Sequence, residues 1–169
     1  MLTRIAVATI ILSLILPVAG FAQGFSQGDK VLTLSGTGLS NEDFDNTTLS
    51  VSGDLSYFFT NSISGAVRQT VGFSDNGDSD WTASTRVAAD YNFDMGRWWP
   101  FAGGSIGYVY GDDINDSWVI GPEAGIRYFV NQTTFILGMI EWEFFFNHGN
   151  GPDEEDSTFI YLLGIGFRW

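Results

Sequence analysis

One histidine stands near residues that could complete a hydrolytic site. His148 lies in the segment NHGNGPDEEDS, and Asp153 and Ser157 follow it closely. A serine nucleophile needs a base that a third group orients, and it needs donors that stabilise the oxyanion. The glycine-rich segment supplies neither a fixed rotamer nor an oxyanion site, and the lack of cysteine excludes thiol catalysis. We therefore expect no enzymatic activity and no cofactor.

Acidic residues gather in four segments, which raises the question of cation binding. SNEDFDN, SDNGDSD, GDDINDS and NHGNGPDEED hold 13 of the 20 acidic residues and no lysine or arginine. Asp75, Asp78 and Asp80 have the alternating carboxylates of a Ca²⁺ loop, but the distal bidentate glutamate of an EF-hand is missing. Three interpretations stay open: a solvated surface, a weak site for Ca²⁺ or Mg²⁺, and a docking surface for a basic partner.

A second set of charges lies within apolar segments, on the face that alternates with the apolar side chains. Its members are Asp54, Arg68, Arg86, Asp90, Glu123, Arg127, Glu141, Glu143 and Arg168. Enclosed charges must pair, because an isolated buried charge costs several kcal/mol. The near balance of acids and arginines favours a structural hydrogen-bonded network, and a gated proton or ion path is the alternative.

Eight segments with this alternation must position the charges. They cover residues 29–39, 48–59, 62–73, 81–93, 100–110, 117–130, 133–146 and 157–169. Each is long enough for a tilted strand to cross a bilayer, which takes about 9–11 residues. The acidic segments follow every second strand, and the short joints TNS, DMGRWW and NQT follow the others. An up-and-down meander explains this sorting, because alternate loops share one end of a barrel.

The orientation of the strand faces decides between two kinds of barrel. A soluble lipocalin-type barrel places the apolar face inside, whereas a membrane barrel places it outside. Few charges, mixed with Gly, Ser and Ala, occupy the polar face, and aromatic residues such as Trp81 and Phe93 end the apolar face. The sequence thus predicts an all-β, eight-stranded antiparallel transmembrane barrel. Gln69 is an exception, since alternation places it on the lipid face.

The N-terminal segment MLTRIAVATIILSLILPVAGFAQG has the plan of a secretory signal peptide. Arg4 precedes an apolar run that Pro17 ends, and small residues lead to Ala22. We expect cleavage after Ala22, which divides the chain into a signal peptide at 1–22 and a barrel domain at 23–169. A retained membrane helix is disfavoured because the apolar run is short. The net charge of −13 excludes nucleic acid as a partner, since phosphate would be repelled.

Several stretches resemble a known family. RWWPFAGGSIGYVYGD, GPEAGIRYFV and the closing GIGFRW are similar to strands of small outer-membrane β-barrels of the opacity-protein and OmpA-like, porin-family type. The signal peptide predicts export through the Sec pathway, and the resemblance implies an eight-stranded barrel in a Gram-negative outer membrane. We expect contact with outer-membrane lipid and lipopolysaccharide, and a monomer. The resemblance also implies that the barrel-assembly machinery reads Tyr161, Phe167 and Trp169 in the last strand. A structural, surface-exposed protein is the leading hypothesis, and a narrow channel or small-solute transporter is the alternative.

Overall fold

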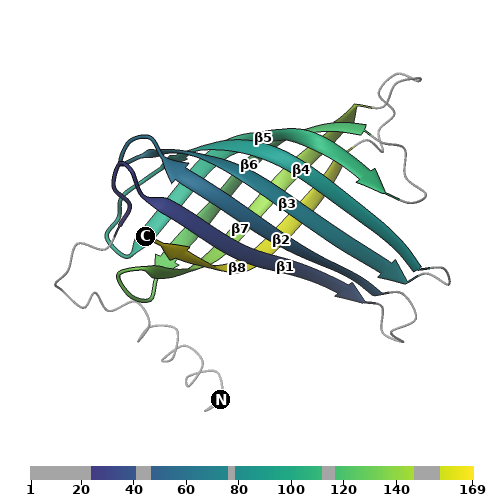
Figure 1. Cartoon of the computed structure of the whole chain (residues 1–169), viewed down its shortest axis with the longest axis horizontal. Helices are drawn as coiled ribbons and strands as arrows, with labels where there is room; N and C mark the ends of the chain where they lie inside the picture. Colours follow the sequence, from purple (N-terminus) through teal and green to yellow (C-terminus); the bar gives the residue numbers. More distant parts are fainter. Residues whose placement is uncertain (1–23, 41–46, 76–78, 112–116, 147–156) are drawn as a thin grey trace, which may run out of the picture.

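The chain closes into one barrel of eight antiparallel strands (Figure 1). The computed structural model describes residues 24–40, 47–75, 79–111, 117–146 and 157–169. The strands are β1 (Lys30–Ser40), β2 (Thr47–Phe58), β3 (Ile63–Asp75), β4 (Ser79–Asn92), β5 (Trp98–Gly111), β6 (Ser117–Phe129), β7 (Thr134–Phe146) and β8 (Ser157–Arg168). This confirms the predicted fold and the eight predicted strands, whose bounds agree to within about two residues.

Each strand pairs with its neighbours in the sequence, and β8 pairs with β1 to close the barrel. β1 begins and β8 ends at the same end of the barrel, where the short connections also lie (Figure 1). We call this the short-turn end, and the opposite one the loop end. Within the described residues, no helix has the length and hydropathy that a membrane crossing requires.

Local side-chain hydrogen bonds form the short turns. The Thr60 hydroxyl accepts the backbone N–H of Ile63 at 2.9 Å, and the Asn131 side chain accepts that of Thr134 at 2.8 Å. Gly96, in the turn after β4, has φ +75°, which glycine adopts without steric cost. These residues are typical of tight turns, and they fix the register of the paired strands that follow.

The outer face of the barrel is apolar and carries aromatic pairs at both ends. Val67, Val87 and Ile106 lie in register across β3, β4 and β5, and each is about half exposed. Trp98 packs against Tyr128 near the short-turn end, and Tyr108 packs against Trp118 near the loop end. A continuous apolar band between aromatic girdles is the exterior that a lipid bilayer requires.

The polar exception on this face, Gln69, has its own partners. Its side-chain carbonyl accepts the Thr85 hydroxyl at 2.6 Å, and its amide donates to the Tyr110 hydroxyl at 3.2 Å. The predicted outward direction of Gln69 is therefore confirmed. Its polar atoms are satisfied by neighbours on β4 and β5, which lowers the cost of placing them among apolar groups.

A charge in the middle of the apolar band is expected to be costly. Val87→Arg should destabilise the barrel in lipid vesicles by about 2–4 kcal/mol, because the guanidinium would lie near the bilayer midplane. Tyr91→Arg, on the same face of β4 but near its end, is the matched control and should cost about 0–1 kcal/mol. Urea unfolding in vesicles measures both values, and equal costs for the two variants would contradict the assignment of this face to lipid.

Candidate functional site

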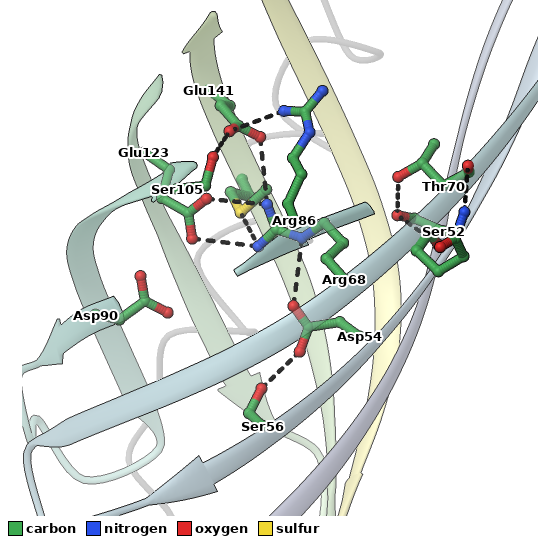
Figure 2. Close-up of polar contacts among 12 residues, drawn as sticks. Ser52, Asp54, Ser56, Arg68, Thr70, Arg86, Asp90, Ser105, Glu123 and Glu141 are labelled. Carbon is green, nitrogen blue, oxygen red and sulfur yellow. Dashed lines mark hydrogen bonds and ion pairs between the residues drawn. The ribbon is translucent and has the colours of Figure 1, made fainter. Parts of the chain in front are cut away.

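The barrel interior holds the strongest candidate site, a layer of buried charges midway along the lumen (Figure 2). It contains Asp54 on β2, Arg68 on β3, Arg86 on β4, Glu123 on β6, and Glu141 and Glu143 on β7. We call these six residues the ion-pair layer. Strand alternation turns each of them inward, and five strands thereby contribute to one cluster.

Arg68 is the centre of the ion-pair layer (Figure 2). Its Nη1 donates to Glu123 at 2.9 Å and to Glu141 at 3.2 Å, and its Nη2 donates to the second Glu123 oxygen at 3.2 Å. Its Nε donates to Asp54 at 3.3 Å. One guanidinium thus joins carboxylates from three other strands across the lumen, using the fork geometry that suits bidentate pairing.

Arg86 completes the ion-pair layer toward β7. It donates to Glu141 at 3.0 Å and forms a second ion pair with Glu143. The Ser105 hydroxyl on β5 also donates to Glu141. The Nε of Arg86 is buried and has no hydrogen-bond partner among the described residues. The layer contains four carboxylates and two guanidiniums, so its formal charge is negative when all six groups are ionised.

A separate ion pair, formed by Arg127 and Asp90, lies between the ion-pair layer and the short-turn end of the lumen. Arg127 donates to Asp90 at 3.2 Å and also to the Asn92 side chain. Its guanidinium carbon lies 3.8 Å from the ring centroid of Phe101, a cation–π contact. Arg127 therefore joins the charged part of the lumen to an aromatic part.

The short-turn end of the lumen is filled by rings. Phe25, which precedes β1, is 4 % exposed and stacks on Phe58 with 4.2 Å between centroids. Trp99, Phe129 and Phe135 surround it at centroid distances of 5.2, 5.0 and 5.6 Å. We call these five residues the aromatic floor. An eight-stranded barrel is just wide enough to be filled by side chains, and the floor fills it at this end.

Arg168 lies apart from the ion-pair layer, and among the described carboxylates it pairs with Asp29, not with the inward carboxylates with which the sequence analysis grouped it. It lies at the last residue of β8, where it pairs with Asp29 at 3.1 Å and donates to the carbonyl of Gly24. It also donates to the Gln132 carbonyl in the turn between β6 and β7. Its inward direction follows the alternation, but its position at the strand end puts it beside the N-terminal segment. Arg168 therefore anchors the segment that carries Phe25.

The remaining predicted residues can be placed only in part. Tyr161, Phe167 and Trp169 are exposed on the outer face of β8 and at its end, and their role in assembly stays a prediction. Asp78, His148 and Asp153 lie outside the described residues, as do the side chains of Asp75 and Asp80. Among the described residues, no group of three or more His, Cys, Asp or Glu side chains is placed to hold a metal ion.

The aromatic floor was missed from the sequence, although part of its signal was present. Phe58 shares the strand face of Asp54, and Phe129 shares that of Arg127, so alternation alone turns both inward. Phe25 lies outside the alternating segments, and nothing in its neighbourhood indicates that it enters the lumen. The hydrogen bonds of Ser105 to Glu141 and of Arg127 to Asn92 were not predicted, because alternation places a small polar side chain on the inward face but does not indicate its partner.

The fold is shared with small outer-membrane barrels of known structure. Neisserial surface protein A is similar with a TM-score of 0.62 and 17% identity, over 84% of this chain and 96% of that one. OprG from Pseudomonas aeruginosa gives 0.58 and 12%, over 88% and 99%. Ail from Yersinia pestis, determined in a phospholipid nanodisc, gives 0.53 and 15%, over 85% and 100%. Neither a scan against protein-family models nor a search of curated proteins gave a match. At these identities the comparisons establish the eight-stranded fold.

Proposed function

We propose that this chain is an integral outer-membrane β-barrel with a closed lumen and a structural, non-enzymatic role in a Gram-negative envelope. The apolar exterior between aromatic girdles supports a place in lipid, and the neighbours of the same fold are outer-membrane proteins. Each of the three neighbours is covered almost completely by the alignment, so the likeness concerns the whole barrel.

The observation that carries the closed lumen is the presence of two barriers in series. The ion-pair layer crosses the middle of the lumen, and the aromatic floor fills its short-turn end. Glu123, Glu141 and Glu143 are each at most 3% exposed, so water does not reach these carboxylates in quantity. A continuous aqueous path needs solvated walls, and for this reason a narrow channel or transporter is the weaker alternative.

The proposal also assigns the loop end of the barrel to the cell surface. The four acidic segments connect strands at that end, and we propose that they face the outside of the cell. They would carry a solvated negative surface, a weak Ca²⁺ or Mg²⁺ site near lipopolysaccharide phosphates, or a docking surface for a basic partner. Contact with outer-membrane lipid, delivery by the barrel-assembly machinery and a monomeric state complete the proposal.

Electrical recording tests the closed lumen. In planar bilayers the wild-type barrel is expected to give no reproducible openings, because both barriers block the lumen. Glu141→Gln keeps the size of the side chain and removes one charge, and it should stay silent because Glu123 and the aromatic floor remain. A large porin, whose barrel leaves an aqueous channel, is the positive control. Reproducible openings whose conductance changes in Glu141→Gln would overturn the closed lumen and favour a channel.

A further inference from the structure

The seam between β1 and β8 is open over its loop-end half. The two strands are in register only from Val31 opposite Arg168 to Gly36 opposite Leu163. β1 continues to Ser40 and β8 begins at Ser157, so residues 37–40 and 157–162 have no partner across this seam in the described ladder. Every other neighbouring pair of strands matches ten or more residues. We call the unpaired stretch the β1–β8 opening.

The exposure of the outer side chains agrees with a missing neighbour. Tyr161 and Leu163 on β8 are 68% and 73% exposed. Among the side chains of β1 to β7 whose exposure is described, the most exposed large apolar one is that of Phe146, at 58%. Leu163 is still paired, and its neighbours Gly36 and Gly138 have no side chains to cover it, but Tyr161 lies in the opening and is more exposed than the outer side chains of the fully paired strands.

A cavity of about 430 Å³ runs from the lumen to this opening. Its inner wall includes Arg86 and Glu143 of the ion-pair layer, and its outer part includes Phe159 and Tyr161 from the lipid side of β8. Side chains from both faces of one strand can line the same cavity only where that strand lacks a neighbour. The volume lies within the range of about 300–1,000 Å³ that is common for small-molecule sites.

The inner wall offers a hydrogen-bond donor that the protein does not use. Arg86 is 6% exposed and lines the cavity; its Nη1 donates to Glu141 and Glu143, whereas its Nη2 donates to no described residue and, unlike the Nε, is not fully enclosed. This nitrogen can therefore take an acceptor from outside the chain, and hydrogen bonds to charged groups are stronger than those between neutral groups. Glu143 lies beside this donor and is in register with Thr158 at the opening.

We propose that the cavity binds a single-chain amphiphile, an alkyl chain with a small uncharged hydroxyl head, which enters from the bilayer through the β1–β8 opening. The hydroxyl oxygen accepts from Arg86 Nη2, and its proton donates toward Glu143. The alkyl chain lies along Leu162 and Ile160 and leaves between the strands beside Tyr161. The lumen beyond is shut by the aromatic floor, so the cavity leads back to the membrane and not through the barrel.

The charges of the wall select the head group. An alkanoate could accept from Arg86, but it would face the surplus carboxylates Glu141 and Glu143. An alkylammonium has no lone pair to accept from Arg86 and lies beside two guanidiniums. A neutral hydroxyl can both accept and donate a hydrogen bond, and neither the carboxylates nor the guanidiniums repel it. The inference rests on the proposed function, because the bilayer supplies the ligand.

The proposal is tested by closing the β1–β8 opening with a disulfide crosslink. The chain has no cysteine of its own, so the introduced pair is the only one that can form. Thr37 and Leu162 are the next pair if the β1–β8 register continues, so Thr37→Cys with Leu162→Cys should staple the seam. In lipid nanodiscs, 1-dodecanol should give saturable shifts of the backbone amides of Gly36 and Ile160 in the reduced protein. Oxidation should weaken binding by at least about tenfold, and reduction should restore it.

Two further variants keep the outcome interpretable. Ser56→Cys with Ala66→Cys crosslinks an inward register pair of β2 and β3 away from the cavity, and its oxidation should leave binding unchanged. Leu162→Cys alone, carrying a bulky methanethiosulfonate adduct, fills the cavity without requiring the seam to close, and it should also lose binding. Shifts that do not saturate, or that persist with the cavity filled, overturn the site.

The head group and the membrane placement are tested separately. Dodecanoate and dodecylamine, at equal bilayer concentration, should bind at least about tenfold more weakly than 1-dodecanol. Equal binding of either one overturns the selection of a hydroxyl. A heat-modifiability gel on the same samples reports whether the barrel has inserted. Failure to insert overturns the proposed function together with the site, whereas an inserted barrel that does not bind dodecanol overturns the site alone.

Discussion

Arg68→Leu is expected to destabilise the folded barrel by about 3–5 kcal/mol, the cost of breaking a buried ion pair by removing one partner. Arg68 joins Asp54, Glu123 and Glu141, and its loss leaves these three carboxylates with one guanidinium, that of Arg86, for the whole layer. Urea unfolding of the refolded barrel in lipid vesicles measures the change. Arg97→Leu, in the turn between β4 and β5, is the matched control: its partly exposed guanidinium lies near the Tyr128 ring and donates to the Val130 carbonyl, and its loss should cost much less.

The cost at Arg68 should depend on pH in a known direction. Removal of the guanidinium leaves buried carboxylates whose ionised forms repel one another, and protonation relieves this repulsion. The difference in unfolding free energy between wild type and Arg68→Leu should therefore shrink as the pH falls into the range where carboxylates protonate. A difference that stays constant with pH would show that Arg68 acts through packing and not through its charge.

Phe25→Ala is expected to cost about 3 kcal/mol, the lower end of the range for truncating a buried phenylalanine. Phe25 fills the space among Phe58, Trp99 and Phe129, and its removal leaves a cavity that these rings cannot fill from fixed strands. The lower end applies because the short N-terminal segment can leave its site. The measurement is urea unfolding in detergent micelles, where barrel and floor unfold together if the floor is part of the cooperative unit.

Two variants serve as controls for Phe25. Phe59→Ala removes an equally large side chain that is 56% exposed, and it should change the unfolding free energy by about 0.5 kcal/mol or less in micelles. Phe25→Leu keeps an apolar group in the floor and should cost less than alanine. If Phe25→Ala and Phe59→Ala have equal effects, Phe25 does not fill the lumen.

The strands and the direction of their side chains could be predicted from the sequence because alternation has a period of two. The inward position of Arg68, Glu123 and Arg127 follows from that period alone. The partners of each charge do not follow, because they depend on the tilt and register of strands on opposite sides of the lumen. Arg68 on β3 reaches Glu123 on β6, 55 residues away, and local spacing carries no signal for such a contact.

The N-terminal segment and the β1–β8 opening were beyond prediction for different reasons. Phe25 lies in a short segment without periodicity, and contacts with residues far away in the sequence hold that segment at the end of the barrel, among them those of Arg168 and of the rings around Phe25. The unpaired part of β8 has the same alternation as its paired part, so the pattern that predicts the strand says nothing about its neighbour. Closure of a barrel depends on the pairing of two strands at opposite ends of the chain, and local alternation carries no signal for it.

The central claim is that the apolar side chains face lipid and the charged ones face the lumen. A nitroxide scan in lipid vesicles, with one cysteine introduced at a time, tests it most directly. Labels at Val67, Val87 and Ile106 on the outer face are expected to collide with oxygen, which partitions into lipid, and to be shielded from a water-soluble nickel reagent. Labels at the inward pair Ala66 and Ala88 are expected to be shielded from both reagents. Access of the nickel reagent to Val67, Val87 and Ile106, with oxygen reaching Ala66 and Ala88 instead, would contradict the placement of the apolar face toward lipid.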